Sequence, residues 1–314
     1  MKKTIKLQGL RALSFLLLSS LLLLSVSAYA LDRQFSFPLT QGVWHQKWQT
    51  DSTGVLRNIN ILKIDYTRND LDLKVAVAST ASHERTSSIA SRNHALAAIN
   101  GGYFNFTGSH VGVVMQDGKL INPNATDIPP RGAIGFTPGH GVVIDRVETA
   151  NNKVKGINGT DWTGVTEVLG GGPVLVFKGQ PVNWWKEESM GDSFNSTRHP
   201  RTAIGFTKDT VIYMVVIDGR QPNFATGISL DDLARFFIDQ LGCEYALNLD
   251  GGGSSTMVVT NMVVNSVSDR IKKADVNKAL KTDPDDDPNN IARANGPQGV
   301  ERPVTNAIIL KHEE

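Results

Sequence analysis

The chain has a single cysteine among 314 residues, and this scarcity excludes several kinds of site. Cys243 has no second thiol to pair with, so no internal disulfide can form. Its neighbours are apolar, and we expect it to be buried rather than reactive. Neither a Cys-x-x-Cys pair nor a His-x-x-x-His pair occurs, so the spacing offers no zinc site. The sequence therefore predicts neither a metal nor a cofactor.

Motifs that would identify a common reaction are also missing. The three consecutive glycines Gly251-Gly252-Gly253 are not followed by a lysine, so they do not form a P-loop. A dinucleotide-binding turn needs spaced glycines that open a helix, and a β-like run follows here instead. No Gly-x-Ser-x-Gly elbow is present, which leaves a serine hydrolase without support.

Hydrophobic runs long enough to span a membrane, about 20 residues, are absent. The one extended apolar run, 12–24, follows four basic residues and precedes Ala28-Tyr29-Ala30. This order is typical of a secretory signal peptide, which we place at 1–30 with cleavage near Ala30. We expect an exported protein, periplasmic or extracellular, that has no membrane span after cleavage.

A large excess of charge of one sign is also lacking. Removal of 1–30 takes away four basic and no acidic residues, which turns the formal net charge from +1 to −3. This weak negative charge argues against nucleic acid as a partner. We expect 31–314 to form one domain, with 268–299 as a loop insertion before the last strand. The acidic stretch 283–288 is a solvated loop or, alternatively, a calcium site, although it lacks an Asp-x-Asp-x-Asp-Gly loop.

The rest of the chain reads as short strands separated by glycine turns, with few helices. These patterns predict an α+β fold, a single domain of mixed, largely antiparallel β-sheet with a few helices. The individual predictions are a strand at 71–77 paired with 59–66, a short helix capped by Thr86 or Ser87, a central strand at 211–217, a helix that opens at Ser229 with Asp232 in a capping box, and a closing strand at 302–310.

Polar side chains and glycines meet where one apolar strand ends. Asn248 and Asp250 share one strand face, while Leu247 and Leu249 point to the other. The glycines that follow let a ligand approach the backbone, and the hydroxyls of Ser254, Ser255 and Thr256 come next. The stretch predicts a site for a polar ligand, and oxyanions suit it. The alternative is a plain glycine-rich loop.

Other strand ends repeat this pattern. Asn100-Gly101-Gly102 ends a small-residue strand, and Asp218-Gly219 ends the central one. Carboxylates at strand ends, Asp218 and Asp250, suit glycosyl transfer. Arg201 opens another strand and could bind a phosphate through two hydrogen bonds, or form a structural salt bridge.

Two further pairs have two interpretations each. Trp184-Trp185 could stack on a sugar or pack as loop aromatics. Glu301 and Arg302 could belong to the site or form a surface ion pair.

Six motifs in order carry a resemblance over roughly residues 55–311. They are Asn100-Gly101-Gly102-Tyr103-Phe104, Gly171-Gly172-Pro173, Arg201-Thr202-Ala203, Ile217-Asp218-Gly219-Arg220, Asn248 to Thr256, and Arg302-Pro303-Val304-Thr305-Asn306. In this order they resemble the phosphodiester glycosidase family.

The resemblance implies an enzyme, a glycosyl hydrolase that cuts the C1–O bond of a sugar-1-phosphodiester in a glycan or glycolipid. It also implies that Asn100, Arg201, Asp218, Asn248 and Asp250 line the pocket. We expect Asp250, Asp218 and Glu301 to be the catalytic residues. The expected substrate-binding residues are Asn100, Gly101, Gly102, Arg201, Asn248, Gly251, Gly252, Ser254, Ser255 and Arg302. Which carboxylate acts as nucleophile or base stays open. The alternative function is a non-catalytic module that binds phosphoglycans or belongs to the cell envelope and its exopolysaccharide.

Overall fold

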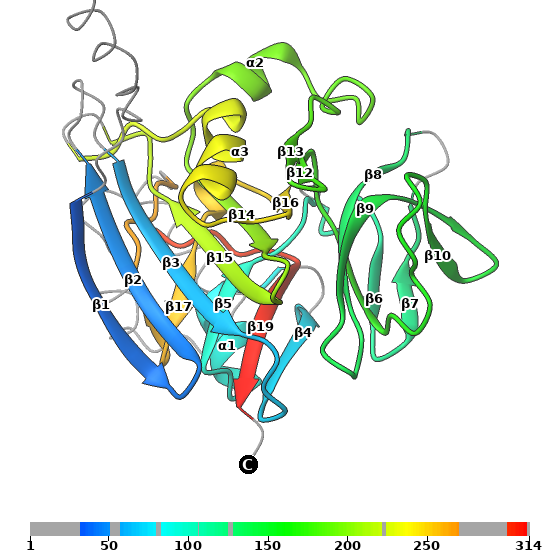
Figure 1. The fold of residues 1–314 in the computed structure, drawn as a ribbon, viewed down its shortest axis with the longest axis horizontal. Helices are drawn as coiled ribbons and strands as arrows, with labels where there is room; N and C mark the ends of the chain where they lie inside the picture. The colour runs from blue at the N-terminus through cyan, green and yellow to red at the C-terminus, as the bar shows by residue number, and fades with distance from the viewer. Residues whose placement is uncertain are drawn as a thin grey trace, which may run out of the picture. The chain divides into compact units, whose positions relative to one another are not determined.

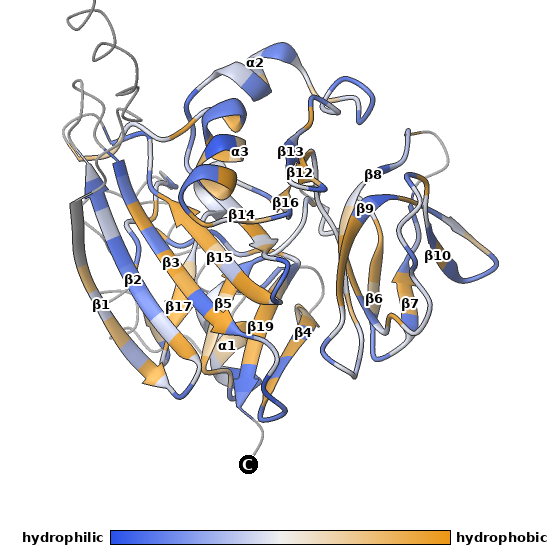
Figure 2. Ribbon diagram, viewed as in Figure 1, coloured by the Kyte–Doolittle hydropathy of each residue, from blue (hydrophilic) through white to orange (hydrophobic). Residues whose placement is uncertain are grey.

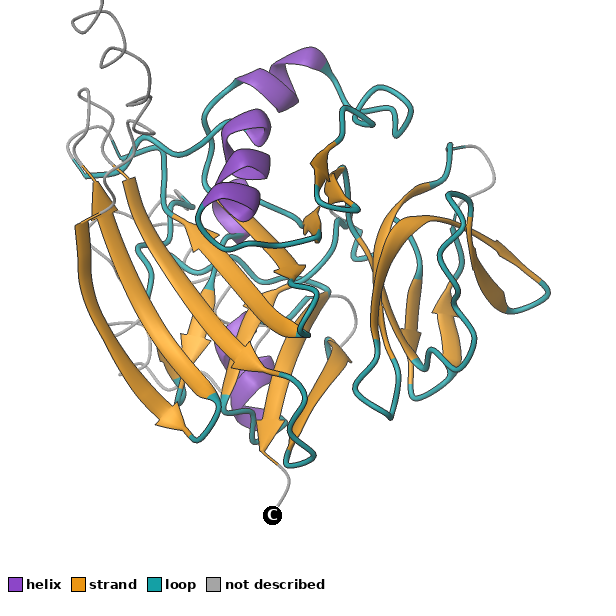
Figure 3. Ribbon diagram, in the orientation of Figure 1, coloured by secondary structure: helices purple, strands orange, loops and turns teal. Residues whose placement is uncertain are grey.

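Three antiparallel sheets and three short helices form the regular structure of the described residues (Figures 1 and 3). The structure is a computed structural model, and it describes residues 32–50, 57–79, 83–105, 107–124, 128–221, 224–269 and 300–312. The predicted α+β class with largely antiparallel sheets is confirmed. The predicted signal peptide, the acidic stretch 283–288 and all but the first two residues of the expected insertion lie outside the described residues.

The largest sheet has eight strands in the order β1-β2-β3-β15-β14-β16-β12-β13. Their bounds are β1 Asp32–Thr40, β2 Val43–Thr50, β3 Arg57–Asp65, β15 Val211–Ile217, β14 Arg201–Phe206, β16 Tyr245–Asn248, β12 Val174–Phe177 and β13 Gln180–Pro181. The central position predicted for the strand at 211–217 is confirmed, because β15 pairs with β3 on one side and β14 on the other. Met214 and Val216 face one core while Val215 and Ile217 face another.

A five-stranded sheet has the order β18-β17-β5-β19-β4. Its strands are β18 Met262–Val263, β17 Met257–Val259, β5 Ala97–Asn100, β19 Asn306–His312 and β4 Leu71–Val77. The closing strand predicted near the C-terminus is β19, which lies between β4 and β5.

The predicted pairing of 71–77 with 59–66 is wrong. Both strands exist, but β4 pairs with β19, whereas β3 pairs with β2 and β15 in the eight-stranded sheet. The reason is burial. β3 is buried along nearly its whole length, as an interior strand is, and β2 and β15 occupy its two edges, while the short turn after Tyr66 carries the chain across to the other sheet.

A six-stranded sheet, β10-β9-β8-β11-β6-β7, forms the third layer of strands. It consists of β10 Lys153–Gly156, β9 Val142–Ala150, β8 Arg131–Phe136, β11 Glu167–Gly170, β6 Val114–Gln116 and β7 Lys119–Asn122. The largest hydrophobic cluster draws side chains from all three sheets, among them Leu62, Ile99 and Ile134. Figure 2 shows hydrophobic and hydrophilic residues interspersed along the strands.

Two helices cover the outer faces of the sheets. α3, Leu230–Asp239, packs Leu233 and Phe237 onto the eight-stranded sheet, and the predicted cap is present because Ser229 Oγ accepts from the Asp232 amide. α1, Thr86–Arg92, packs onto the five-stranded sheet. The third helix, α2, is Asp192–Ser196. No helix within the described residues is long and apolar enough to cross a membrane.

Candidate active site

The ends of β5, β14 and β16 meet, and Asn100 joins them. Asn100 Oδ1 accepts hydrogen bonds from Thr202 Oγ1 at 2.7 Å and from the Thr256 amide at 3.1 Å, and its Nδ2 donates to the Asp250 carbonyl at 2.7 Å. Asn100 is fully buried. This predicted site residue therefore ties the five-stranded sheet to the eight-stranded sheet, directly beneath the glycine-rich turn. It positions the backbone of Asp250.

Gly101 and Gly102 pass close to other backbone, as only glycine can here. The Gly101 amide donates to the Asn306 carbonyl and the Gly102 amide to Asn306 Oδ1. A Cβ on Gly102 would overlap the carbonyl oxygen of Gly170. Both glycines therefore fix the chain path into the site.

The glycine-rich turn shapes the surroundings of Asp250. Gly252 has a φ of +63°, in the region that favours glycine, and its amide donates to the Pro200 carbonyl at 2.9 Å. The guanidinium of Arg220 lies against Gly252, 3.0 to 3.2 Å from where a Cβ would stand, and that of Arg302 lies against Gly253. The turn lets two cations come close to one carboxylate.

Burial raises the pKa of Asp250 to about 6, although the residue as a whole is partly exposed. The Ser254 hydroxyl, Arg302, the Gly251 amide and Arg220 all act in the opposite direction and favour the charged carboxylate. Asp250 is therefore ionised at neutral pH and titrates close to the range in which a general base works.

Arg201 is a buried cation without a carboxylate partner in the part of the chain that the structure describes. It is 2 % exposed, and it donates to the carbonyls of Phe194 at 2.6 Å and Thr197 at 3.1 Å and more weakly to that of Ile228. Burial lowers its pKa to about 10, so the side chain remains charged at neutral pH.

This environment favours one of the two interpretations of Arg201. A structural salt bridge to a described carboxylate is not present, and Nη1 makes no hydrogen bond to a described residue. A buried charge that lacks a counter-ion is costly, and an anionic ligand would relieve this cost. The geometry favours an anion site.

Tyr103 lies near enough to both Asp250 and Arg201 for their charges to shift its pKa, and it was not among the predicted site residues. Burial and the Asp250 carboxylate raise the pKa of Tyr103, while the charge of Arg201 lowers it. Its hydroxyl donates to the Gly172 carbonyl at 2.7 Å and accepts from Asn248 Nδ2 at 2.9 Å. The signal was available, since Tyr103 directly follows Asn100-Gly101-Gly102. We call Tyr103, Arg201, Asn248 and Asp250 the Asp250 cluster.

Asn248 sits at the end of β16 as predicted, and it is fully buried. Its Nδ2 also donates to the carbonyl of Gly172 at 2.8 Å, so it orients the Tyr103 hydroxyl and the cis Gly172-Pro173 segment together. Leu247 and Leu249 both lie in the largest core cluster. The predicted role of the two leucines as core anchors is confirmed, whereas β16 ends at Asn248 and the shared face of Asn248 and Asp250 stays a prediction.

Asp218 lies in a different environment. It is buried, and its carboxylate accepts from the side-chain amides of Asn58 and Asn265 and from the Ser266 amide. Burial raises its pKa to about 6. Asn265 also donates to the carbonyl of Ser255. Asp218 thus fastens the 265–266 segment, and through it the glycine-rich turn.

Glu301 and Arg302 do not form the surface pair considered above. Glu301 is fully buried and accepts from the Ser87 amide at 2.8 Å and the Ser87 hydroxyl at 2.6 Å, at the start of α1. The predicted cap on α1 by Thr86 or Ser87 is wrong, because the N-cap residue is Arg85, whose side chain makes no capping hydrogen bond to the helix. Arg302 binds Asp269 through two hydrogen bonds of 2.8 Å.

The remaining predictions concern the single cysteine and metal-binding groups. Cys243 is buried, as expected, and burial raises its pKa. Among the described residues, no group of three or more His, Cys, Asp or Glu side chains is placed to hold a metal ion. The Asp250 cluster itself brings together one carboxylate, one tyrosine hydroxyl, one side-chain amide and one guanidinium.

Comparison with known proteins gives the family. Residues 93–311 match the phosphodiester glycosidase family. The chain is 28% identical over 220 residues to the SPbeta prophage-derived protein YomE of Bacillus subtilis, covering 66% of this chain and 31% of that protein. It is 26% identical over 179 residues to N-acetylglucosamine-1-phosphodiester alpha-N-acetylglucosaminidase of Mus musculus, covering 55% of this chain and 33% of that enzyme. The chain spans about a third of the length of these relatives.

Solved structures share the fold. A protein from Synechocystis superposes with a TM-score of 0.65 at 16% identity, covering 91% of this chain and 64% of the other. The catalytic domain of zebrafish N-acetylglucosamine-1-phosphodiester alpha-N-acetylglucosaminidase superposes with a TM-score of 0.60 at 18% identity, covering 92% and 85%. These superpositions show a shared fold. The chain belongs to the phosphodiester glycosidase family.

Proposed function

We propose that this protein is an exported hydrolase that cleaves the glycosidic C1–O bond of a sugar-1-phosphodiester in a glycan or glycolipid. The observation that carries the proposal is the presence of two opposite charges near Tyr103: Arg201, a buried cation without a described counter-ion, and the ionised Asp250, each of which shifts the pKa of the Tyr103 hydroxyl. Export rests on the signal-like sequence of residues 1–30.

The positive charge of Arg201 and the negative charge of Asp250 suit the two sides of the C1–O bond that would be cleaved. Arg201 would hold the phosphate, which departs as a phosphomonoester and keeps the bridging oxygen and the electron pair of the C1–O bond. Because phosphate is a good leaving group, a cation there can replace a strong general acid. Asp250 would face C1, where positive charge develops, and either attack C1 or take a proton from the water that attacks it. Both roles need the ionised carboxylate.

The neighbouring groups would act through these two. Tyr103 and Asn248 both donate to the Gly172 carbonyl, so they would hold this segment in place beside the cluster. Asp218 is enclosed by hydrogen-bond donors, so we assign it a positioning role for the 265–266 segment. Glu301, which binds the start of α1, receives the same kind of role.

The test is hydrolysis of a panel of α- and β-linked sugar-1-phosphodiesters by residues 31–314. Sugar release is expected from at least one compound. In ¹⁸O water, C1–O cleavage leaves the released phosphomonoester unlabelled, whereas cleavage of the P–O bond would label it and contradict the proposal. Binding without any turnover by the folded protein would support the non-catalytic alternative instead.

Variants link the activity to the cluster. Asp250→Asn keeps the size of the side chain and removes its charge, and it should lower turnover by about 100-fold or more with folding retained. Asp239→Asn is a matched control, because Asp239 is an exposed carboxylate at the end of α3. Near-normal turnover in Asp250→Asn would remove Asp250 from the reaction.

A further inference from the structure

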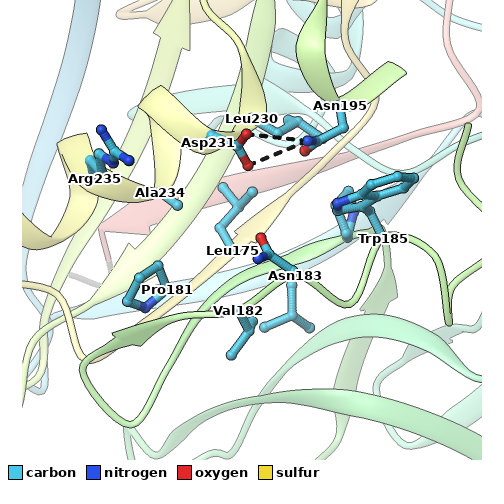
Figure 4. A pocket seen from close by; sticks show the side chains of 12 residues that line it. Leu175, Pro181, Val182, Asn183, Trp185, Asn195, Leu230, Asp231, Ala234 and Arg235 are labelled. Carbon is cyan, nitrogen blue, oxygen red and sulfur yellow. Dashed lines mark hydrogen bonds between the residues drawn. The ribbon is translucent and has the colours of Figure 1, made fainter. Parts of the chain in front are cut away.

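A pocket of about 230 Å³ opens between α3, α2 and the β12–β13 hairpin (Figure 4). Its lining combines aliphatic, aromatic, amide and charged side chains, and the residues used below are Asn183, Trp185, Asn195, Asp231 and Arg235. This volume is below the range of about 300–1,000 Å³ that drug-sized ligands occupy, so one small ring fits better than an extended molecule.

Trp185 borders this pocket, while its neighbour Trp184 does not line it. Trp184 packs against the core, with its ring 5.0 Å from that of Phe177 and 4.7 Å from the guanidinium of Arg146. The two members of this pair therefore differ: Trp184 is a packed loop aromatic, whereas Trp185 lines the pocket and has Lys186 Nζ over its ring, 4.9 Å from the ring centre. The Met190 amide donates to the Trp185 carbonyl at 2.7 Å, which holds the backbone of Trp185 in place.

Planar polar groups border the pocket beside the indole (Figure 4). Asn195 Nδ2 donates to both carboxylate oxygens of Asp231, at 3.3 and 3.4 Å, so these two side chains form one fixed array. The Asn183 amide adds a donor and an acceptor. A pyranose ring has an apolar CH face that matches an aromatic face and hydroxyls at its edge that match amides and carboxylates.

The charges in the pocket point to a neutral ligand. Asp231 and Arg235 lie four residues apart on α3, both line the pocket, and their charges are opposite. The pocket thus lacks the excess positive charge that a phosphate would need. This distinguishes it from the surroundings of Arg201.

The pocket adjoins the Asp250 cluster through two segments. The Gly172 carbonyl contacts Tyr103 and Asn248, and the next residue, Pro173, lines the pocket. On α2, Phe194 contacts Arg201, with the guanidinium 4.8 Å from its ring centre, and the next residue, Asn195, lines the pocket.

We propose that this pocket binds one neutral pyranose unit of a saccharide, stacked on Trp185 and hydrogen-bonded by Asn183 and the Asn195–Asp231 pair. The binding itself does not depend on the proposed reaction. Its use as an accessory site for a glycan whose phosphodiester lies at the Asp250 cluster rests on the proposed function.

Binding can be measured with the methyl glycosides of glucose, galactose, mannose and N-acetylglucosamine by saturation-transfer NMR on residues 31–314. At least one glycoside should show transfer at about 10 mM. Trp185→Ala and Asn183→Ala should each weaken that binding by about tenfold. Trp44→Ala is the matched control, because the Trp44 ring also lies beneath a lysine, Lys63 at 5.6 Å, but stands on β2 away from this pocket.

The outcomes separate this inference from the proposed function. Asn183 is exposed, so its truncation tests the pocket even where Trp185→Ala fails to fold. No transfer from any of the four glycosides, or equal transfer in the wild type and both pocket variants, overturns the inference. Binding through Trp185 in a protein that cleaves no phosphodiester would leave the pocket standing and remove the proposed reaction.

Discussion

The activity of this protein should depend steeply on pH because of the surroundings of Asp250. Burial raises its pKa from 3.8 to about 6, and the proposed reaction needs the ionised form. At pH 5 a group with a pKa of about 6 is only about 10% ionised, whereas an ordinary aspartate would be about 90% ionised. We therefore expect kcat/KM to fall about tenfold for each pH unit below about 6, because kcat/KM reports the free enzyme.

Two perturbations should move this acidic limb in a predictable direction. Arg302 favours the ionised carboxylate, so Arg302→Gln should shift the limb to higher pH. A bound phosphodiester brings a negative charge toward Asp250, so the limb in kcat should lie at higher pH than the limb in kcat/KM.

The assay is sugar release from the best phosphodiester of the panel between about pH 4 and about pH 8 at constant ionic strength. Asp218 is the internal control, because burial also raises its pKa to about 6 while its carboxylate is held by amides. Asp218→Asn should keep the limb. A wild-type limb near pH 4, or one that disappears in Asp218→Asn alone, would refute the assignment of Asp250.

Three other substitutions test the remaining parts of the structure. Arg201→Lys loses hydrogen bonds to the carbonyls that the guanidinium reaches, and it should raise KM by at least about tenfold and lower kcat, as measured by steady-state kinetics. Cys243→Ala should lower the free energy of unfolding by about 1–3 kcal/mol in urea titrations and leave turnover unchanged, since Cys243 is buried away from the cluster; loss of activity would revive a thiol mechanism. Burial raises the pKa of Glu188 from 4.5 to about 7, so its contribution to stability is full below pH 4.5 and is lost as pH rises through 7; Glu188→Gln should remove on the order of 3 kcal/mol of that pH dependence in melts between pH 4 and 8.

Elements with a strong local pattern could be predicted from the sequence. β15 is apolar at every position that must be buried on both faces, and α3 carries its own cap at Ser229 and an apolar stripe. The burial of Leu247 and Leu249 could also be predicted, from the alternation of apolar and polar residues around them. In each case the information lies within about ten neighbouring residues, which is the range that periodicity and capping describe.

Features that depend on distant partners could not be predicted in this way. The strand at 71–77 was identified, but its neighbour β19 lies more than 200 residues further along the chain. The start of α1 is bound by Glu301, which is 214 residues from Ser87. Tyr103 becomes part of the site only because the cis Gly172-Pro173 segment and Asn248 arrive beside it. The local sequence around each residue does not indicate these long-range contacts.

The two strand-end aspartates show how far this limit extends into function. Ile217-Asp218-Gly219 and Leu249-Asp250-Gly251 are nearly the same local sequence, and burial raises both carboxyl pKa values to about 6. Asp218 receives amide donors from Asn58, Asn265 and Ser266, so its oxygens are already engaged.

Asp250 instead receives the amide of its own turn and the charges of Arg302 and Arg220, and it shares Tyr103 with Arg201. Hydrogen bonds from fixed amides lock a carboxylate in place, whereas neighbouring cations keep it charged and leave it able to act on a ligand. Under the proposed function, the difference between a positioning residue and a catalytic one thus comes from the segments at 265–266 and 302. Neither could be connected to its aspartate from the sequence alone.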